Sequence, residues 1–243
     1  MLSFNYEGFP TRVLRRTGYI VGAVLLTALS MPGVTGQGLT ATAEMGAVML
    51  PEPRQKSGLS IEQALLRRRS QREFSPAPLE LMEVGQLVWA AQGISSREGL
   101  RTAPSAGALY PLEVYLAAGH VTGLEAGVYR YDQHRHRLVQ VTAGDKRNSL
   151  ADAAWGQAWV AEAPVVIVLA AVYERTTAKY GRRGLRYVHM EAGHAAQNLC
   201  LQGVSLGLGT TTVGAFSDDE VKRALGLTGS EAPLYLLPVG RPR

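Results

Sequence analysis

Four arginines and a serine lie close together in the stretch 67–72 (RRRSQR), just before Phe74. Arginine makes charge-assisted hydrogen bonds to phosphate oxygens, each with a net value of about 1.5 to 3 kcal/mol. Two well-placed arginines and the serine hydroxyl would therefore suffice to hold a mononucleotide phosphate. The alternative is a solvated helix end, and the composition of the stretch alone does not decide between the two.

Two other patterns that suggest chemistry are excluded by their geometry. His189 and His194 flank Glu191, but residues five apart lie about 140° apart around a helix, unlike the i, i+4 pair that binds zinc. We therefore predict no metal site. Gly207 and Gly209 follow an expected helix and precede an expected strand. A dinucleotide-binding fold has its glycines after a strand and before a helix, so these glycines indicate the end of a helix instead.

Periodicity and turn signals predict the elements that position these residues. Ser60 and Gln63 indicate a capping-box start for a helix over 61–69, and Pro78 is expected to open a second helix through about Ala91. The apolar run 164–173 predicts a central strand buried on both faces. An α+β pattern is completed by strands at 112–118, 127–131, 137–141, 209–213 and 234–239 and by a helix at 218–225.

The helix expected from Leu185 to about Leu206 carries two apolar stripes, which lie about 200° apart around its axis. A second copy of the chain would cover the second stripe, although burial of both stripes within one subunit is the alternative. The first stripe contains Val188, Ala192, Ala195, Leu199, Gly203 and Leu206, and the second contains Met190, Gln197, Leu201, Val204 and Leu208.

Length and composition favour one globular domain. The chain has 243 residues, of which 46% are hydrophobic and 19% charged, enough for a sizeable core. Part of the net charge of +5 belongs to residues 1–43, and the remaining excess is too small to predict nucleic-acid binding. Cys200 is the only cysteine, which excludes an intramolecular disulfide, and its setting predicts core packing.

The first 43 residues have the pattern of an export signal. Three arginines up to Arg16 precede an apolar run from Tyr19 to about Met31, and small residues end at Ala43. We expect cleavage there and a periplasmic or secreted protein, whereas an uncleaved segment would anchor the chain to a membrane. The pair Arg15-Arg16 is a loose twin-arginine pattern. Residues 44–58 are then a lead-in linker to a domain over 59–243.

Several motifs resemble those of the nitroreductase family and of its SagB-type dehydrogenase branch, which is related to the azoline oxidases. The stretch 68–74 (RRSQREF) is similar to the opening motif of the family. The stretch 101–113 (RTAPSAGALYPLE) is similar to the distinctive motif of the branch, as are 87–93, 127–131 and 189–194. The resemblance covers about Leu50 to Arg241.

This resemblance implies a nitroreductase-like α+β fold, with a mixed central sheet flanked by helices and FMN at the interface of an intertwined homodimer. Arg72 would approach the pyrimidine edge of the flavin, where a fixed positive charge stabilises the reduced form. The backbone N–H of Gly214 would donate to flavin N5. The remaining implied contacts are Arg68, Arg69 and Ser70 for phosphate and ribityl, Arg241 as an extra phosphate ligand, Val213 beside Gly214, Pro104, and Ser105, Ala106 and Gly107 of the partner subunit.

The resemblance also implies hydride transfer through the flavin in a ping-pong scheme, with NADH or NADPH as an electron donor and azoline, nitro or quinone-type substrates. Lys179-Tyr180 is similar to a pair that azoline oxidases use to remove a proton. A lysine whose pKa is lowered by burial or by neighbouring cations can act as a base. The pair lies in a predicted basic and aromatic loop over 173–187. The alternative is that this loop is solvated and holds ordinary surface cations.

Two other functional classes remain open. A flavin carrier or sensor without turnover would carry the same binding motifs. An exported interaction module would not need them. An enzyme would act on a small-molecule or peptide-derived substrate, and because NAD(P)H is scarce outside the cytoplasm, export would call for another electron donor.

Overall fold

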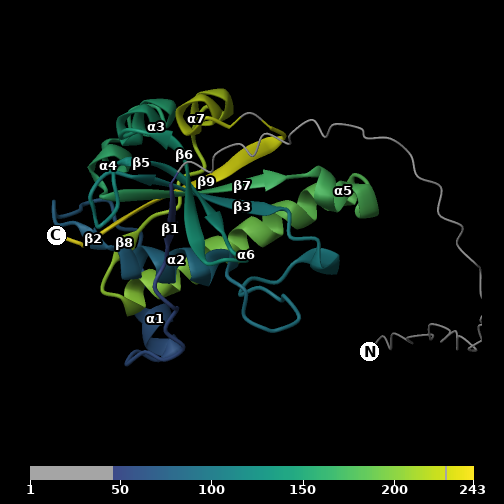
Figure 1. Ribbon diagram of the computed structural model, residues 1–243, viewed down its shortest axis with the longest axis horizontal. Helices are drawn as coiled ribbons and strands as arrows, with labels where there is room; N and C mark the ends of the chain where they lie inside the picture. Colours follow the sequence, from purple (N-terminus) through teal and green to yellow (C-terminus); the bar gives the residue numbers. More distant parts are fainter. Residues whose placement is uncertain (1–45, 228) are drawn as a thin grey trace, which may run out of the picture. The chain divides into compact units, whose positions relative to one another are not determined.

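The computed structural model describes residues 46–227 and 229–243, so the predicted export segment lies outside the described residues. A seven-stranded sheet forms the centre, in the order β1-β6-β5-β3-β7-β9-β8 (Figure 1). Its strands are β1 (Ala47–Met49), β3 (Leu112–Ala118), β5 (Gly127–Asp132), β6 (Arg137–Ala143), β7 (Val165–Val172), β8 (Gly209–Thr210) and β9 (Glu231–Gly240).

All strand pairings in this sheet are antiparallel. The resemblance implied a mixed sheet. Among the described residues, parallel pairing occurs only between β2 (Leu79–Glu80) and β4 (Val121–Thr122), which form a separate pair, and in one bridge between Ser70 and Thr210. The predicted hairpin is confirmed, because β5 and β6 pair antiparallel across the turn.

Strand β7 is the central strand that its apolar run predicted. It pairs with β3 on one side and with β9 on the other, and its residues from Val165 to Ala171 are buried. Because side chains of a strand alternate between the two faces, β7 contributes to two cores. Ile167 and Leu169 belong to one core, and Val166 and Val168 belong to the other.

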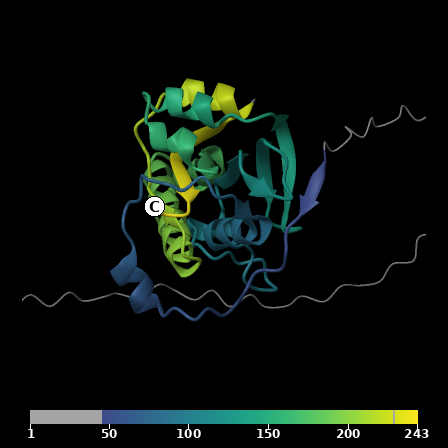
Figure 2. The ribbon, with the colours of Figure 1, turned by 90° about the vertical axis from the view of Figure 1, so that its left-hand side faces the viewer.

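Helices cover both faces of the sheet. Figures 1 and 2 show α2 (Leu81–Gln92) and α6 (Arg183–Ser205) on one face, and α3 (Arg147–Ala153), α4 (Ala158–Glu162) and α7 (Asp218–Leu225) on the other. Two short helices, α1 (Ile61–Arg67) and α5 (Glu174–Tyr180), lie outside these layers, and the 3₁₀ turn η1 spans Ala106–Ala108. Among the described helices, none is long and apolar enough to cross a membrane.

The predicted helix starts are partly confirmed. Ser60 caps α1, since its hydroxyl accepts from the Gln63 N–H at 3.3 Å. Pro78 does not open a helix, because the next two residues pair with β4 and α2 starts at Leu81. A capping box formed by Glu80 and Glu83 replaces it, with the Glu80 N–H donating to Glu83 Oε2 at 2.8 Å.

Helix α6 buries one of its two stripes. The first stripe faces the core, whereas on the second stripe Met190 is 51% exposed and Leu201 is half-buried within this single chain. The helix stops as predicted, because Gly207 adopts a φ of +73°, which favours glycine.

Residues in the predicted lead-in extend the sheet. Strand β1 pairs with β6, and the ring of His136 contacts both the Tyr131 hydroxyl (2.8 Å) and the Pro51 carbonyl oxygen (2.9 Å). The hairpin turn therefore holds the chain that enters the domain. The sequence contains no signal for this contact, because its partners are far apart along the chain.

Candidate functional site

The arginine-rich stretch lies along the edge of the sheet, beside β8 and the end of β9. Ser70 forms a parallel bridge with Thr210 of β8, and the Gln71 N–H donates to the Thr210 carbonyl oxygen at 3.0 Å. Further along, the Ser75 N–H donates to the Arg241 carbonyl oxygen at 2.9 Å. These backbone bonds fix the directions in which the side chains of residues 68–72 leave the chain.

The four side chains proposed for phosphate and flavin differ in their partners. Arg69 Nη1 donates to the carbonyl oxygens of Leu66 (2.9 Å) and Arg68 (2.8 Å), so it caps the end of α1. The Arg72 guanidinium lies over the Trp159 ring, 5.5 Å from its centroid. Within the described residues, the Arg68 guanidinium and the Ser70 hydroxyl have no hydrogen-bond or salt-bridge partner. These two groups can therefore bind a phosphate without breaking a contact.

Arg68 lies beside α6. Burial raises the pKa of the Cys200 thiol, and the nearby positive charge of Arg68 partly opposes this. Cys200 is a free, buried cysteine of the core, as its setting predicted.

Arg241 lies beside the same stretch, but its side chain is already paired. Its Nη2 donates to both carboxylate oxygens of Glu83 at 3.1 Å, and Glu83 also caps α2. The guanidinium that the resemblance assigned to phosphate thus ties the end of β9 to the start of α2. Its backbone, through Ser75, helps to position the arginine-rich stretch.

The Val213–Gly214 segment offers a free backbone donor. Val213 exchanges two backbone hydrogen bonds with Leu236 of β9, at 2.8 and 2.9 Å. Gly214 is exposed, and its N–H has no acceptor within the described part of the chain. Gln157 Nε2 donates to the Ala215 carbonyl oxygen at 3.1 Å and so holds the chain just after this glycine.

The second group of predicted contacts is a tight loop over 104–110. The Ala106 N–H donates to Glu191 Oε1 of α6 at 2.8 Å, and the Tyr110 N–H donates to Ser105 Oγ at 2.9 Å. Gly107 has a φ of +64°, and two non-glycine residues, Ala108 (+54°) and Tyr110 (+47°), also adopt left-handed conformations. Such conformations cost about 1 to 3 kcal/mol each, and they cluster at functional sites.

This loop packs directly against Lys179 and Tyr180. A Cβ added to Gly107 would lie 2.8 Å from Tyr180 Oη and 3.0 Å from Lys179 Nζ. The two residues end α5, so the region that was considered as a solvated loop is helical. Lys179 is exposed, and its Nζ lies 5.4 Å from the centroid of the Tyr180 ring. A cavity of about 260 Å³ adjoins the loop and is lined by Pro104, Ser105, Ala106, Tyr187, Met190, Glu191 and His194.

Arg175 anchors α5, a role that sequence analysis missed. Its Nη2 donates to Oε1 of the buried Glu113 at 2.5 Å, and its Nη1 donates to the Tyr110 carbonyl oxygen at 3.1 Å. One side chain therefore joins α5 to β3 and to the strained loop. His189 and Glu191 have separate partners. His189 Nε2 contacts the Tyr173 hydroxyl at 2.6 Å, whereas Glu191 accepts from the Ala106 N–H of the loop.

The two groups of predicted flavin contacts do not meet within one chain. The loop contacts α6 at Glu191, whereas Arg68 lies near Cys200, nine residues further along. Nine residues advance a helix by about 13 Å and turn it by about half a revolution. The body of α6 therefore separates Ser105, Ala106 and Gly107 from the arginine-rich stretch.

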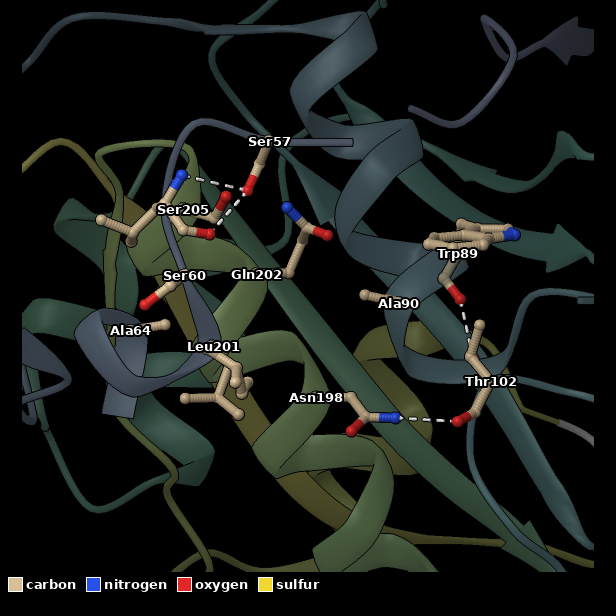
Figure 3. Close-up of a pocket in the computed structure, with 12 residues that line it drawn as sticks. Ser57, Ser60, Ala64, Trp89, Ala90, Thr102, Asn198, Leu201, Gln202 and Ser205 are labelled. Atoms are coloured by element: carbon tan, nitrogen blue, oxygen red, sulfur yellow. Dashed lines mark hydrogen bonds between the residues drawn. The ribbon is translucent and has the colours of Figure 1, made fainter. Parts of the chain in front are cut away.

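A further cavity of about 310 Å³ lies between α1, α2 and α6 (Figure 3). Leu201 and Ser205 of α6 and Ala64 of α1 line it, and Asn198 Nδ2 donates to the Thr102 carbonyl oxygen at its edge (3.2 Å). Next to it, α1 exposes three large apolar side chains, Ile61 (56%), Leu65 (53%) and Leu66 (72%). Leu201 of the second stripe and Ile61 of α1 thus line the same open cavity, beside the exposed apolar side chains of α1.

Comparison with known proteins gives consistent matches. Residues 65–241 match the model of the Nitroreductase family. A Methanocaldococcus jannaschii protein named as a nitroreductase is 49% identical over 183 residues, which cover 75% of this chain and 91% of that protein.

Solved structures match over similar lengths. A Ralstonia eutropha structure described as a nitroreductase has a TM-score of 0.73 and 31% identity, and the match covers 83% of this chain and 91% of that one. An Anabaena variabilis structure, described in the same way, has a TM-score of 0.68 and 34% identity, over 75% of this chain but only 38% of its own. A chain of the Escherichia coli microcin synthetase McbBCD complex, with truncated pro-MccB17 bound, has a TM-score of 0.63 and 26% identity. The match covers 80% of this chain and 78% of that one.

Proposed function

Since this chain belongs to the nitroreductase family of FMN-dependent oxidoreductases, we propose that it transfers hydride through an FMN bound between two copies of the chain. When bound, FMN would supply hydride transfer between a donor and an acceptor that use the same face in turn, in a ping-pong scheme. The observation that carries this proposal is that Arg68, Ser70 and Gly214, beside β8 and β9, have donors without an acceptor within the described residues. Arg72 lies in the same stretch, over the Trp159 ring.

The residues present suit FMN in their chemistry. Arg68 and Ser70 have free donors for phosphate oxygens, and Arg69 remains a neighbouring positive charge. Arg72 supplies a positive charge for the pyrimidine edge, where it stabilises the negative charge of the reduced form. The Gly214 N–H is free to donate to N5. Arg241 is the least suited of the predicted ligands, because Glu83 already binds its guanidinium.

A homodimer would complete the site. Because α6 separates the loop over 104–107 from the arginine-rich stretch, a single flavin contacts both groups only if they come from different chains. The exposed Met190, the half-buried Leu201 and the apolar side chains of α1 give such a dimer an apolar surface to bury. A two-fold axis would then create two equivalent sites, each with Ser105, Ala106 and Gly107 of the partner subunit.

The substrate is proposed by class. Nitro groups and quinones would accept hydride from the reduced flavin, whereas an azoline ring would give a hydride to the oxidised flavin and lose a proton as it becomes an azole. The likeness to the microcin synthetase complex favours a peptide-derived azoline within the SagB-type branch. Tyr180 and Lys179 contact the loop that faces the flavin, and this supports a role for the pair in moving a proton to or from the substrate.

The predicted export segment, residues 1–43, makes a periplasmic or secreted enzyme our proposal for the location, with membrane attachment if the segment stays on the chain. An exported enzyme needs an electron donor other than cytoplasmic NADH or NADPH. The FMN-binding domain over 59–243 completes the proposed organisation, together with the lead-in over 44–58, whose strand β1 joins the sheet of this domain.

An absorption spectrum of the purified full chain tests the proposal, taken before and after adding FMN and then NADH or NADPH. Flavin bands that bleach with the nicotinamide support an NAD(P)H-linked oxidoreductase. Bands that persist with nicotinamide but bleach with dithionite, and return on adding a quinone, support an enzyme with another donor. Reduced flavin that no acceptor reoxidises would favour a carrier or sensor, and failure to bind FMN at all would refute the proposal.

A further inference from the structure

Helix α4 lies beside both segments that are proposed to meet the flavin. Its residue Trp159 contacts Arg72, which belongs to the stretch between α1 and β2. Its N-cap residue Gln157 donates to the Ala215 carbonyl oxygen, one residue after Gly214. A helix of five residues thus connects two segments that are far apart in the sequence.

The position of α4 is itself fixed. Trp159 packs against the core that contains Val213 and Phe216, on either side of Gly214. Arg147 Nη1 donates to the Ala163 carbonyl oxygen at the end of α4 at 2.7 Å, just before the central strand β7. The Trp159 ring therefore has a defined place relative to the sheet and to Gly214.

Arg72, in contrast, is held only by this ring. Its side chain is exposed, and within the described residues the Trp159 face is its only partner, 5.5 Å from the guanidinium carbon. A cation within about 6 Å of a tryptophan face is attracted by about 0.5 to 1 kcal/mol at an exposed site. The Trp159 Nε1–H is buried and has no acceptor in the described part of the chain, so a hydrogen bond does not explain why a tryptophan is present here.

We propose that Trp159 is a positioning residue, which holds the Arg72 guanidinium at the pyrimidine edge of the bound flavin and so favours the reduced flavin over the oxidised one. This inference rests on the proposed function. The oxidised flavin is neutral at this edge and the reduced flavin is negative, so a better-fixed guanidinium stabilises the reduced form more. Trp159 itself does not touch the flavin in this proposal.

The test measures the midpoint potential and the Kd of oxidised FMN in the full chain loaded with FMN. Trp159→Leu should lower the preference for reduced over oxidised FMN about two- to fivefold, which follows from the cation–π range. That change is about 9 to 21 mV for a two-electron couple. Trp159→Phe keeps an aromatic face and removes an N–H without an acceptor, so it should keep most of the preference.

Two controls separate positioning from packing. Trp155→Leu makes the same change at a 71% exposed tryptophan in the turn before α4, and should leave the potential unchanged. In an Arg72→Met background, Trp159→Leu should have no further effect on the potential. An equal shift in that background would overturn the proposal, since Trp159 would then act through packing alone. An unchanged potential in Trp159→Leu would overturn it as well.

Fluorotryptophan provides a test that does not depend on a folded Trp159→Leu variant. Fluorination weakens the negative face of the ring while nearly preserving its size. Progressive fluorination should lower the potential stepwise in the wild-type chain but not in Arg72→Met, and a potential that ignores fluorination refutes the inference.

The failure of the proposed function has a different signature. A wild-type chain that retains no FMN refutes the function itself. If Arg72→Met binds FMN with unchanged affinity and potential, Arg72 does not contact the flavin, and the inference fails although the chain is a flavoprotein.

Discussion

Neighbouring arginines in the stretch 67–72 differ in what already binds them. Arg69 caps α1 and Arg72 lies on Trp159, whereas the Arg68 guanidinium has no hydrogen-bond partner within the described residues. A group without a competing partner gives its full hydrogen-bonding capacity to a ligand. Arg68 is therefore the side chain on which phosphate binding should depend most.

We predict that Arg68→Met raises the Kd for FMN about ten- to a hundredfold, the range of one charge-assisted hydrogen bond. Fluorescence titration of FMN measures it. Arg67→Met is the matched control, because Arg67 is an exposed residue of α1 outside the motif. Equal losses in both variants would mean that only the local charge matters, against a specific role for Arg68.

At the scale of residues, the sequence predicted the motif residues but not the side chains that hold them in place. Lys179, Tyr180 and Gly107 were all predicted as site residues, and the structure brings them together. Trp159 and Arg175 were missed, because their partners Arg72 and Glu113 lie far away in sequence, and no local pattern marks such a contact.

At the scale of elements, the loop over 104–110 and helix α5 fit each other closely. Gly107 has a left-handed φ, and a side chain there would meet Tyr180 Oη and Lys179 Nζ. We predict that Gly107→Ala lowers stability by about 1 to 2 kcal/mol and reduces turnover by displacing the pair. Thermal unfolding and steady-state assays measure the two effects.

Gly99→Ala is the control for Gly107→Ala, since Gly99 also has a positive φ but open space around it. Gly99→Ala should lower the free energy of unfolding by a similar amount but leave turnover unchanged. Equal turnover in both variants would contradict a close functional contact between the loop and α5.

The start of α3 predicts a pH dependence of stability. Hydrogen bonding from Arg147 lowers the pKa of Asp145, with burial opposing it. A carboxyl whose pKa is lowered on folding stabilises the protein above its unfolded pKa of about 3.9, and this contribution disappears as the pH falls through the folded pKa. Asp145→Asn should therefore lower the Tm at pH 7 and reduce the loss of Tm between pH 5 and pH 3. A Tm deficit that stays constant down to pH 3 would contradict it.

Elements with clear end signals were predicted best. Helix α7 spans 218–225 as expected, with acidic residues in its first turn and Gly226 at its end. Helix α5 was predicted as a loop, because its sequence (ERTTAKY) has no apolar stripe, and its position depends on Arg175. Helices α3 and α4 were missed, since short helices bury too few residues to show a period.

At the scale of the whole molecule, the uncovered side of α6 is the feature that one chain leaves unexplained. The two stripes were predicted from sequence, yet the sequence did not decide what covers the second one. In the single chain, Met190 stays exposed and Leu201 half-buried, so burial of both stripes within one subunit is not observed.

We predict that Leu201→Glu raises the Kd of the proposed dimer about a hundredfold or more, because it would place an unpaired charge in the proposed apolar interface. Sedimentation at several protein concentrations measures it, and FMN should be released together with dissociation. Trp155→Glu, at an exposed apolar residue away from α6, should stay dimeric. A monomeric wild-type chain that binds FMN tightly would contradict the composite site.

The separation of the two residue groups by α6 has a genetic consequence. A chain defective at Arg68 and a chain defective at Lys179 would each be inactive alone. When both are expressed together, a mixed dimer of the proposed kind would have one pocket that carries both defects and one that carries neither. Two recessive alleles would thus restore up to half of the activity, and partial complementation in a strain that carries both would reveal sites shared between chains without any purified protein.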